Sequence, residues 1–175
     1  MIKVDFQKPL LIQSVAFKDV FLRMDGNGIK AATGSGAGKV NCQKSLAPTG
    51  AFKVHQQQDG TCTIESVKYP GVFLRMDGSR IHSFSGAGAG TVNCQFGASG
   101  WERFKLNNLD DGSYSIESVA FPNVVLRMDG NNPSKKEEDF GTVNCQYKAG
   151  AYEKFNLINL PEAGIGKDLF NKMHM

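Results

Sequence analysis

Four kinds of polar residue recur three times along this 175-residue chain, at intervals of 51 or 52 residues. They are Arg23, Arg75 and Arg127; Asp25, Asp77 and Asp129; Asn41, Asn93 and Asn144; and Gln43, Gln95 and Gln146. Carboxylate, amide and guanidinium groups in reach of one another can hold the vicinal hydroxyl groups of a sugar with paired donors and acceptors. The alternative is structural, because the aspartate can cap its own turn and the arginine can pair with an acid.

Aromatic rings that would complete a sugar site occur in two of the three units. An aromatic residue precedes a glutamate at Trp101–Glu102 and again at Tyr152–Glu153, whereas residues 49–50 of the first unit are Thr and Gly. A ring can stack on the apolar face of a sugar. We therefore predict saccharide sites, strongest in units two and three, formed from Asp25, Asn41, Asp77, Asn93, Gln95, Trp101, Glu102, Asp129, Asn144, Gln146, Tyr152 and Glu153.

The sequence has few features that would indicate catalysis or metal binding. Its histidines do not recur, no nucleophile or zinc-protease motif occurs, and no CxxC spacing exists. Three cysteines share the phase of a recurring valine, which predicts buried free thiols. These cysteines are Cys42, Cys94 and Cys145, and Cys62 stands apart without an evident partner. We predict a protein that is not an enzyme and has neither a metal site nor a cofactor.

The elements that would position these residues are short strands. The string LRMDG begins at Leu22, Leu74 and Leu126, and VNCQ begins at Val40, Val92 and Val143. Each unit has four strand-like segments separated by turn sequences such as Pro-Gly and Asp-Gly. The alternation places Ile12/64/116, Leu22/74/126, Met24/76/128, Val40/92/143 and Phe52/104/155 in the core and the recurring polar residues on the outward face.

Three units of four strands predict an all-β fold, the β-trefoil, with twelve strands and pseudo-threefold symmetry. A closed barrel of six strands capped by three hairpins uses all twelve and leaves no long open edge. Three units are too few for a blade-per-repeat propeller, which typically has about 4 to 8 blades. We expect an N-terminal arm (1–9), one trefoil domain (10–161, with repeats 10–60, 61–112 and 113–161) and a C-terminal tail (162–175).

The repeated segments also resemble known families. The F/Y-P-x-V-x-L-R, V-N-C and W-E-R-F-K-L segments resemble the fascin-like, actin-crosslinking branch of the β-trefoil superfamily. The segment IESVAFPNVVLR is similar to the repeat of arabinofuranose-binding trefoil modules. This resemblance covers about residues 10–161 and implies the fold, whereas the ligand is left open because trefoils bind sugars, actin, proteases and receptors.

The composition of the chain argues against some classes of binding partner. With 41% hydrophobic and 21% charged residues the chain is typical of a globular domain, and a dispersed net charge of +3 argues against nucleic acid. No apolar stretch is long enough to span a membrane and the N-terminus does not look like a signal peptide, so we expect a cytoplasmic protein. The oligomeric state is left open.

Three hypotheses about the function are consistent with the sequence. The leading hypothesis is a lectin for a saccharide or glycoconjugate, and the chief alternative is a fascin-like protein that binds F-actin. The third is a protease inhibitor or toxin-type binding domain acting through one of the divergent loops, 27–39, 79–90 or 131–141.

Overall fold

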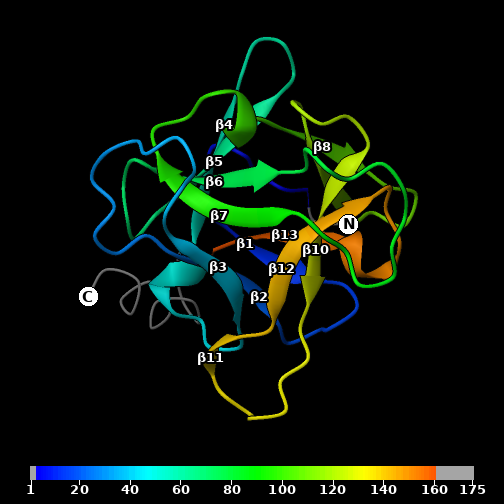
Figure 1. The fold of residues 1–175 in the computed structure, drawn as a ribbon. Helices are drawn as coiled ribbons and strands as arrows, with labels where there is room; N and C mark the ends of the chain where they lie inside the picture. The colour runs from blue at the N-terminus through cyan, green and yellow to red at the C-terminus, as the bar shows by residue number, and fades with distance from the viewer. Residues whose placement is uncertain (1–2, 161–175) are drawn as a thin grey trace.

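The computed structural model describes residues 3–160, which form short β-strands joined by turns and loops (Figure 1). The predicted tail, residues 162–175, lies outside the described residues. Repeat one contains β1 (Leu10–Ser14), β2 (Phe21–Asp25), β3 (Lys39–Gln43), the 3-10 turn η1 (Pro48–Gly50) and β4 (Phe52–Gln56). Repeat two contains β5 (Cys62–Ser66), β6 (Val72–Asp77), β7 (Thr91–Phe96), η2 (Gly100–Glu102) and β8 (Phe104–Asn108). Repeat three contains β9 (Tyr114–Ser118), β10 (Val124–Asp129), β11 (Glu138–Phe140), β12 (Thr142–Tyr147), η3 (Ala151–Glu153) and β13 (Phe155–Asn159).

Six of these strands close into a barrel. Going around it, β1 pairs with β4, β4 with β5, β5 with β8, β8 with β9, β9 with β13, and β13 with β1. Six of the other strands form the hairpins β2–β3, β6–β7 and β10–β12, which surround the centre of the view in Figure 1. The predicted closed barrel with three hairpins is confirmed.

Among residues 3–160 there are thirteen strands, one more than the predicted twelve, because β11 forms inside the loop of repeat three. It pairs with β3 of repeat one and has a register shift between Glu138 and Phe140. Its sequence shows no alternation, so the strand is formed through backbone hydrogen bonds to a neighbouring edge and was not predicted. Within residues 3–160, no helix has the length and apolar character to cross a membrane.

The core contains the predicted recurring residues. The isoleucines, leucines, methionines and phenylalanines of all three repeats are completely buried, and the valines are 6–7% exposed. Cys42, Cys94 and Cys145 are buried free thiols, as predicted, and so is Cys62. Burial raises the pKa of each of these four thiols to about 12, which makes them poor nucleophiles at neutral pH.

The N-terminal arm packs against the barrel. Val4 and Phe6 are partly buried against the core, and the Phe6 ring meets the Tyr114 ring edge-on at 6.3 Å. The Asp5 amide donates to Asn159 Oδ1 at 2.7 Å, and Asn159 Nδ2 donates back to the Asp5 carbonyl at 2.8 Å. The arm thereby fastens the first described residues to the last strand.

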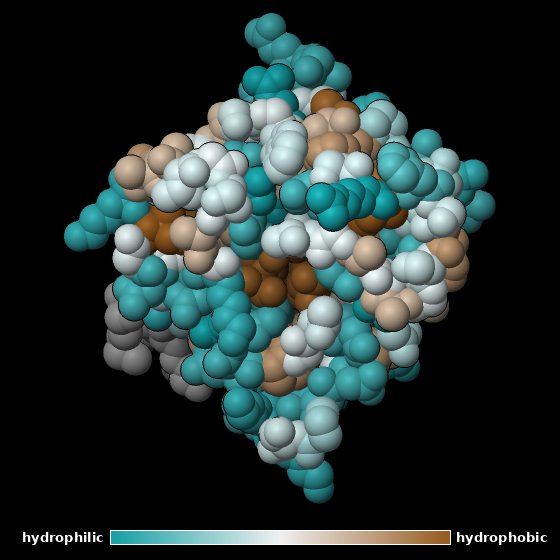
Figure 2. Space-filling view, viewed as in Figure 1, coloured by the Kyte–Doolittle hydropathy of each residue, from teal (hydrophilic) through white to brown (hydrophobic). Residues whose placement is uncertain are grey.

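Each long loop lies across the hairpin of the next repeat. Loop 26–38 of repeat one bonds to Cys94 in β7, loop 78–90 of repeat two forms a bridge from Ala89 to Cys145, and loop 130–141 of repeat three supplies β11 to β3. A Cβ on Gly38 would overlap the Cys94 sulfur, so this close approach requires glycine. The loops cover the outward faces of the hairpins. In the space-filling view the surface of this side of the molecule is largely hydrophilic, with a small hydrophobic hollow near its centre (Figure 2).

Candidate functional site

The three recurring aspartates cap the turns that follow their own strands. Oδ1 of Asp25, Asp77 or Asp129 accepts a hydrogen bond from the backbone amide two residues later, at 3.0–3.1 Å. Neither of the two pockets described below includes an aspartate in its lining. Of the two roles that the sequence left open, the geometry favours turn capping.

The recurring asparagines, and the glutamines of repeats two and three, hold the loop of the preceding repeat. Asn93 donates to the Ser35 carbonyl at 3.1 Å, and Gln95 Oε1 accepts from the Thr33 amide at 3.1 Å. In repeat three the same roles fall to Asn144, which donates to Ala87, and Gln146, which accepts from Ser85. In repeat one Asn41 donates to the Asp139 carboxylate at 2.8 Å.

Because of these contacts, most of the recurring polar side chains on the outward face of the hairpins are buried. The three arginines are at most 9% exposed and the three glutamines at most 4% exposed. They do point away from the barrel core, but the loop of the preceding repeat covers them. The side chains that were expected to meet a ligand are therefore largely occupied in joining repeats.

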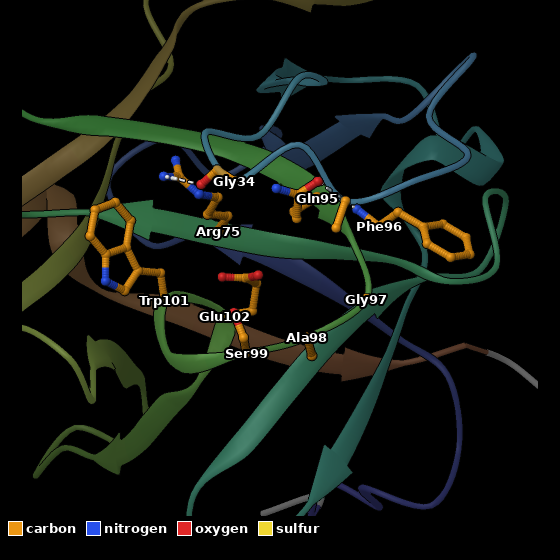
Figure 3. Close-up of a pocket in the computed structure, with 10 residues that line it drawn as sticks. Gly34, Arg75, Gln95, Phe96, Gly97, Ala98, Ser99, Trp101 and Glu102 are labelled. Carbon is orange, nitrogen blue, oxygen red and sulfur yellow. Dashed lines mark hydrogen bonds between the residues drawn. The ribbon is translucent and has the colours of Figure 1, made fainter.

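An open pocket of about 380 Å³ lies beside the covered face in repeat two (Figure 3). The guanidinium carbon of Arg75 lies 4.6 Å from the centroid of the partly exposed Trp101 ring, a cation–π distance. Phe121 meets the same ring edge-on at 5.3 Å. The indole is held in place from two sides. The pocket lining comprises Ala32, Gly34, Arg75, Gln95, Phe96, Gly97, Ala98, Ser99, Trp101 and Glu102.

Repeat three has a second pocket, of about 270 Å³, at the equivalent place. The Arg127 guanidinium lies 5.1 Å from the Tyr152 ring centroid, and Phe17 meets that ring at 5.0 Å. Arg127 Nη2 donates to the Gly86 carbonyl at 3.4 Å, as Arg75 Nη2 does to Gly34 at 3.3 Å. The lining comprises Phe84, Gly86, Arg127, Gln146, Ala151, Tyr152 and Glu153.

A buried carboxyl group lies in the wall of each pocket. Glu102 is 3% exposed and Glu153 is 2% exposed. Burial raises the pKa of both carboxyl groups above 4.5, against the opposing effect of backbone hydrogen bonds and of the neighbouring arginine. Glu153 accepts from the Gly150 amide at 2.7 Å, and its other oxygen lies 4.0 Å from Arg127 Nε. The charge of each carboxyl group is thus partly compensated by hydrogen bonds and by the neighbouring arginine, in the wall of its pocket.

The equivalent place in repeat one is filled by its own side chains. Thr49 Oγ1 donates to Gln43 Oε1 at 2.5 Å, and Gln43 Nε2 donates to the carbonyls of Ser45 and Ala47. A Cβ on Gly50 would lie 2.6 Å from that same nitrogen. The glutamine therefore takes the space that a glutamate side chain occupies in the other two repeats.

The predicted site residues thus separate into two groups. Six of the twelve line the two pockets: Gln95, Trp101, Glu102, Gln146, Tyr152 and Glu153. The other six cap turns or join repeats: Asp25, Asn41, Asp77, Asn93, Asp129 and Asn144. The predicted set lacks Arg75 and Arg127, for which the threefold recurrence was a usable signal, and lacks Phe84, because no aromatic residue recurs at that loop position. Among residues 3–160 no group of three or more His, Cys, Asp or Glu side chains is placed to hold a metal ion.

Comparison with known proteins identifies the architecture. No protein-family profile and no sequence of a characterised protein matches the chain. ThreeFoil, a designed threefold symmetric protein, superimposes with a TM-score of 0.66 over 89% of this chain and 100% of its own, at 15% sequence identity. The chain has a β-trefoil fold.

Two larger proteins contain a similar trefoil. A mosquitocidal holotoxin matches with a TM-score of 0.68 and 10% identity over 92% of this chain, which corresponds to 18% of the toxin chain. A lectin from Polyporus squamosus matches with a TM-score of 0.62 and 12% identity over 90% of this chain and 51% of its own. Identities this low establish the shared trefoil fold alone.

Proposed function

We propose that this trefoil binds saccharides, without converting them, through the pockets of repeats two and three. The observation that carries the proposal is the repetition of one side-chain set: an aromatic ring against an arginine, beside a buried glutamate and a glutamine. A partly exposed ring offers an apolar face to a sugar, and the polar groups around it offer donors and acceptors to hydroxyl groups. Arginine and phenylalanine hold each ring in place, so little side-chain freedom is lost on binding.

Binding rather than hydrolysis agrees with the acidic groups present. Glycoside hydrolysis generally uses a pair of carboxyl groups on either side of the scissile bond. Among the described residues that line each pocket there is one carboxyl group, Glu102 or Glu153. A ligand of this class occurs in a protein that contains a similar trefoil, because the structure of the Polyporus squamosus lectin holds the epitope Neu5Aca2-6Galb1-4GlcNAc.

A glycan array and an agglutination assay test the proposal. We expect each open pocket to bind weakly, with Kd on the order of millimolar to micromolar, and both together to give useful avidity. Trp101→Ala and Tyr152→Ala should each remove one site, and the double variant should abolish agglutination. Thr49→Ala, at the matching position of repeat one, is the control and should leave binding unchanged while the protein stays folded.

The fascin-like alternative is tested in parallel by co-sedimentation with F-actin. Pelleting with actin, together with a silent glycan array, would overturn the saccharide proposal. Saccharide binding that persists in the folded double variant would move the sites elsewhere on the trefoil.

A further inference from the structure

The pocket of repeat three has a second aromatic wall that belongs to a different repeat. Phe84 is 62% exposed, the largest exposed fraction among the large hydrophobic side chains that the structure describes as exposed. It lines the same pocket as Tyr152, although it comes from loop 78–90 of repeat two. A phenylalanine that is 62% exposed leaves most of its apolar area in water, so burial contributes little to explaining why this residue is a phenylalanine.

The backbone that carries Phe84 is firmly attached. The next residue, Ser85, donates its amide to Gln146 Oε1 at 3.0 Å, and Gln146 Nε2 donates back to the Ser85 carbonyl. Gly86 accepts from Arg127, and Ile81 on the near side of the loop is 7% exposed. The loop is anchored on both sides of the ring, which leaves the ring itself at the pocket's rim.

The pocket of repeat two lacks this second wall. The residue matching Phe84 in the loop of repeat one is Ala32. Phe96 also borders that pocket, but its ring packs toward the turn at Gly71, where an added Cβ would lie 2.7 Å from Phe96 Cε2. Figure 3 shows the Phe96 ring directed away from Trp101 and Arg75. Repeat two therefore presents one ring to a ligand and repeat three presents two.

We propose that the repeat-three pocket selects saccharides that carry an aryl aglycone as a second apolar group, and that Phe84 is the residue that selects them. This inference rests on the proposed saccharide binding at Tyr152. The sugar ring stacks on Tyr152 while the additional group covers Phe84 and removes its exposed face from water. The pocket of repeat two has Ala32 at the matching position and therefore binds sugars with and without this additional group equally well.

Matched pairs of glycosides test this selection. Methyl and p-nitrophenyl glycosides of glucose, galactose, mannose and N-acetylglucosamine are titrated by NMR or calorimetry into Trp101→Ala protein, which retains the repeat-three pocket alone. The p-nitrophenyl form should bind about threefold to tenfold more tightly than the methyl form, as expected for one additional aromatic contact. Phe84→Ala should remove this preference, whereas Phe84→Tyr should keep it.

Two further variants exclude a general attraction of the aryl group. Phe96→Ala should leave the preference unchanged, because that ring faces another turn. Ala32→Phe, introduced with Tyr152→Ala, should transfer the preference to the repeat-two pocket. Since Phe84 is exposed, Phe84→Ala should keep its melting temperature.

The outcomes separate the two proposals. If binding depends on Tyr152 but Phe84→Ala does not change the ratio of the affinities for the aryl and methyl glycosides, the role of Phe84 is overturned and the proposed saccharide binding stands. The absence of binding by every glycoside overturns the proposed function and this inference with it.

Discussion

Repeat one and repeat three share an arginine, an asparagine, a glutamine and an aspartate at matching positions, yet the space beside the arginine is filled in one and open in the other. In repeat three Arg127 faces Tyr152 and Glu153, whereas in repeat one Arg23 stands beside Thr49 and Gly50. Two residues decide the difference. The four shared polar residues cap turns or hold loops in place in both repeats, and the aromatic–glutamate pair is what distinguishes the open pocket.

Closing the pocket in repeat one leaves a defect. Arg23 Nε is buried and has no hydrogen-bond partner in the described part of the chain, while the matching Nε of Arg127 lies 4.0 Å from Glu153. The Arg23 head group is instead bound at its other nitrogens, to Asn41 at 3.1 Å and Asp25 at 3.4 Å. Without a glutamate at the matching position, Arg23 Nε has no counterpart of the Glu153 carboxylate, and repeat one has the same fold.

The largest expected effect sharpens this comparison at the arginines themselves. Arg127→Met leaves the buried Glu153 without its cation and should lower the free energy of unfolding by about 3 kcal/mol. Arg23→Met leaves no buried glutamate behind and should cost only about 1–2 kcal/mol. Urea denaturation of both variants measures the difference. Adding Glu153→Gln to Arg127→Met should recover part of the loss, and equal losses in the two single variants would refute the comparison.

A glutamate placed in repeat one breaks the comparison from the other side. Gly50→Glu should cost about 1–3 kcal/mol, because the new side chain needs space that Gln43 occupies. Gly50→Ala should cost less, since the end of the Gln43 side chain can move aside. Thermal denaturation compares the two variants. A Gly50→Glu protein as stable as the original would mean that the Gln43 side chain moves aside freely and that a pocket can form in repeat one.

The turn-capping aspartates should each contribute to stability. Asp77→Ala and Asp129→Ala each remove an acceptor from one backbone amide and should each cost about 1 kcal/mol, whereas Asp25→Ala also removes the contact with Arg23 and should cost more. Saccharide binding by the folded protein should not change, unlike in Trp101→Ala. A selective loss of binding in Asp77→Ala would return that carboxylate to the ligand site.

The smallest effect is an opposite response of the repeats to acid. The hydrogen bond from Lys39, at 2.7 Å, and that from Asn41 lower the pKa of Asp139 from 3.8 to about 2. Stability from this carboxylate is present above pH 3.8 and is lost as the pH falls toward 2. The pKa values of Glu102 and Glu153 are raised instead, so their ionisation destabilises the fold and this cost disappears as the pH falls toward 4.5.

Stability measured against pH in two variants separates these contributions. Asp139→Asn should flatten the curve between about pH 2 and 4, by less than about 1 kcal/mol because this carboxylate is 44% exposed. Glu153→Gln should flatten the curve above pH 4.5. A curve that Asp139→Asn leaves unchanged would show that the loop of repeat three is held by its backbone bonds alone.

The barrel and its core could be predicted because they depend on a pattern that each repeat carries within itself. Alternation at Leu22 and Met24, repeated every 52 residues, is enough to assign the buried face. The loops could not be placed, because each forms its bonds with another repeat. No local signal in residues 131–141 indicates that β11 will pair with β3, and none in loop 78–90 shows that Phe84 will reach the pocket of repeat three.

The pairing of β1 with β13 has a consequence for where the chain can be cut. Leu10 lies opposite Asn159 and the Leu160 amide bonds to the Pro9 carbonyl at 3.2 Å, so the two ends of the described chain meet. A short linker can therefore join them, and a circular permutant opened at the exposed turn 110–112 would keep every loop attached to its neighbouring hairpin. Opening the chain at residue 84 would instead cut one of those three attachments. In this trefoil the point at which the chain starts can change, whereas the contacts that link each repeat to the next cannot.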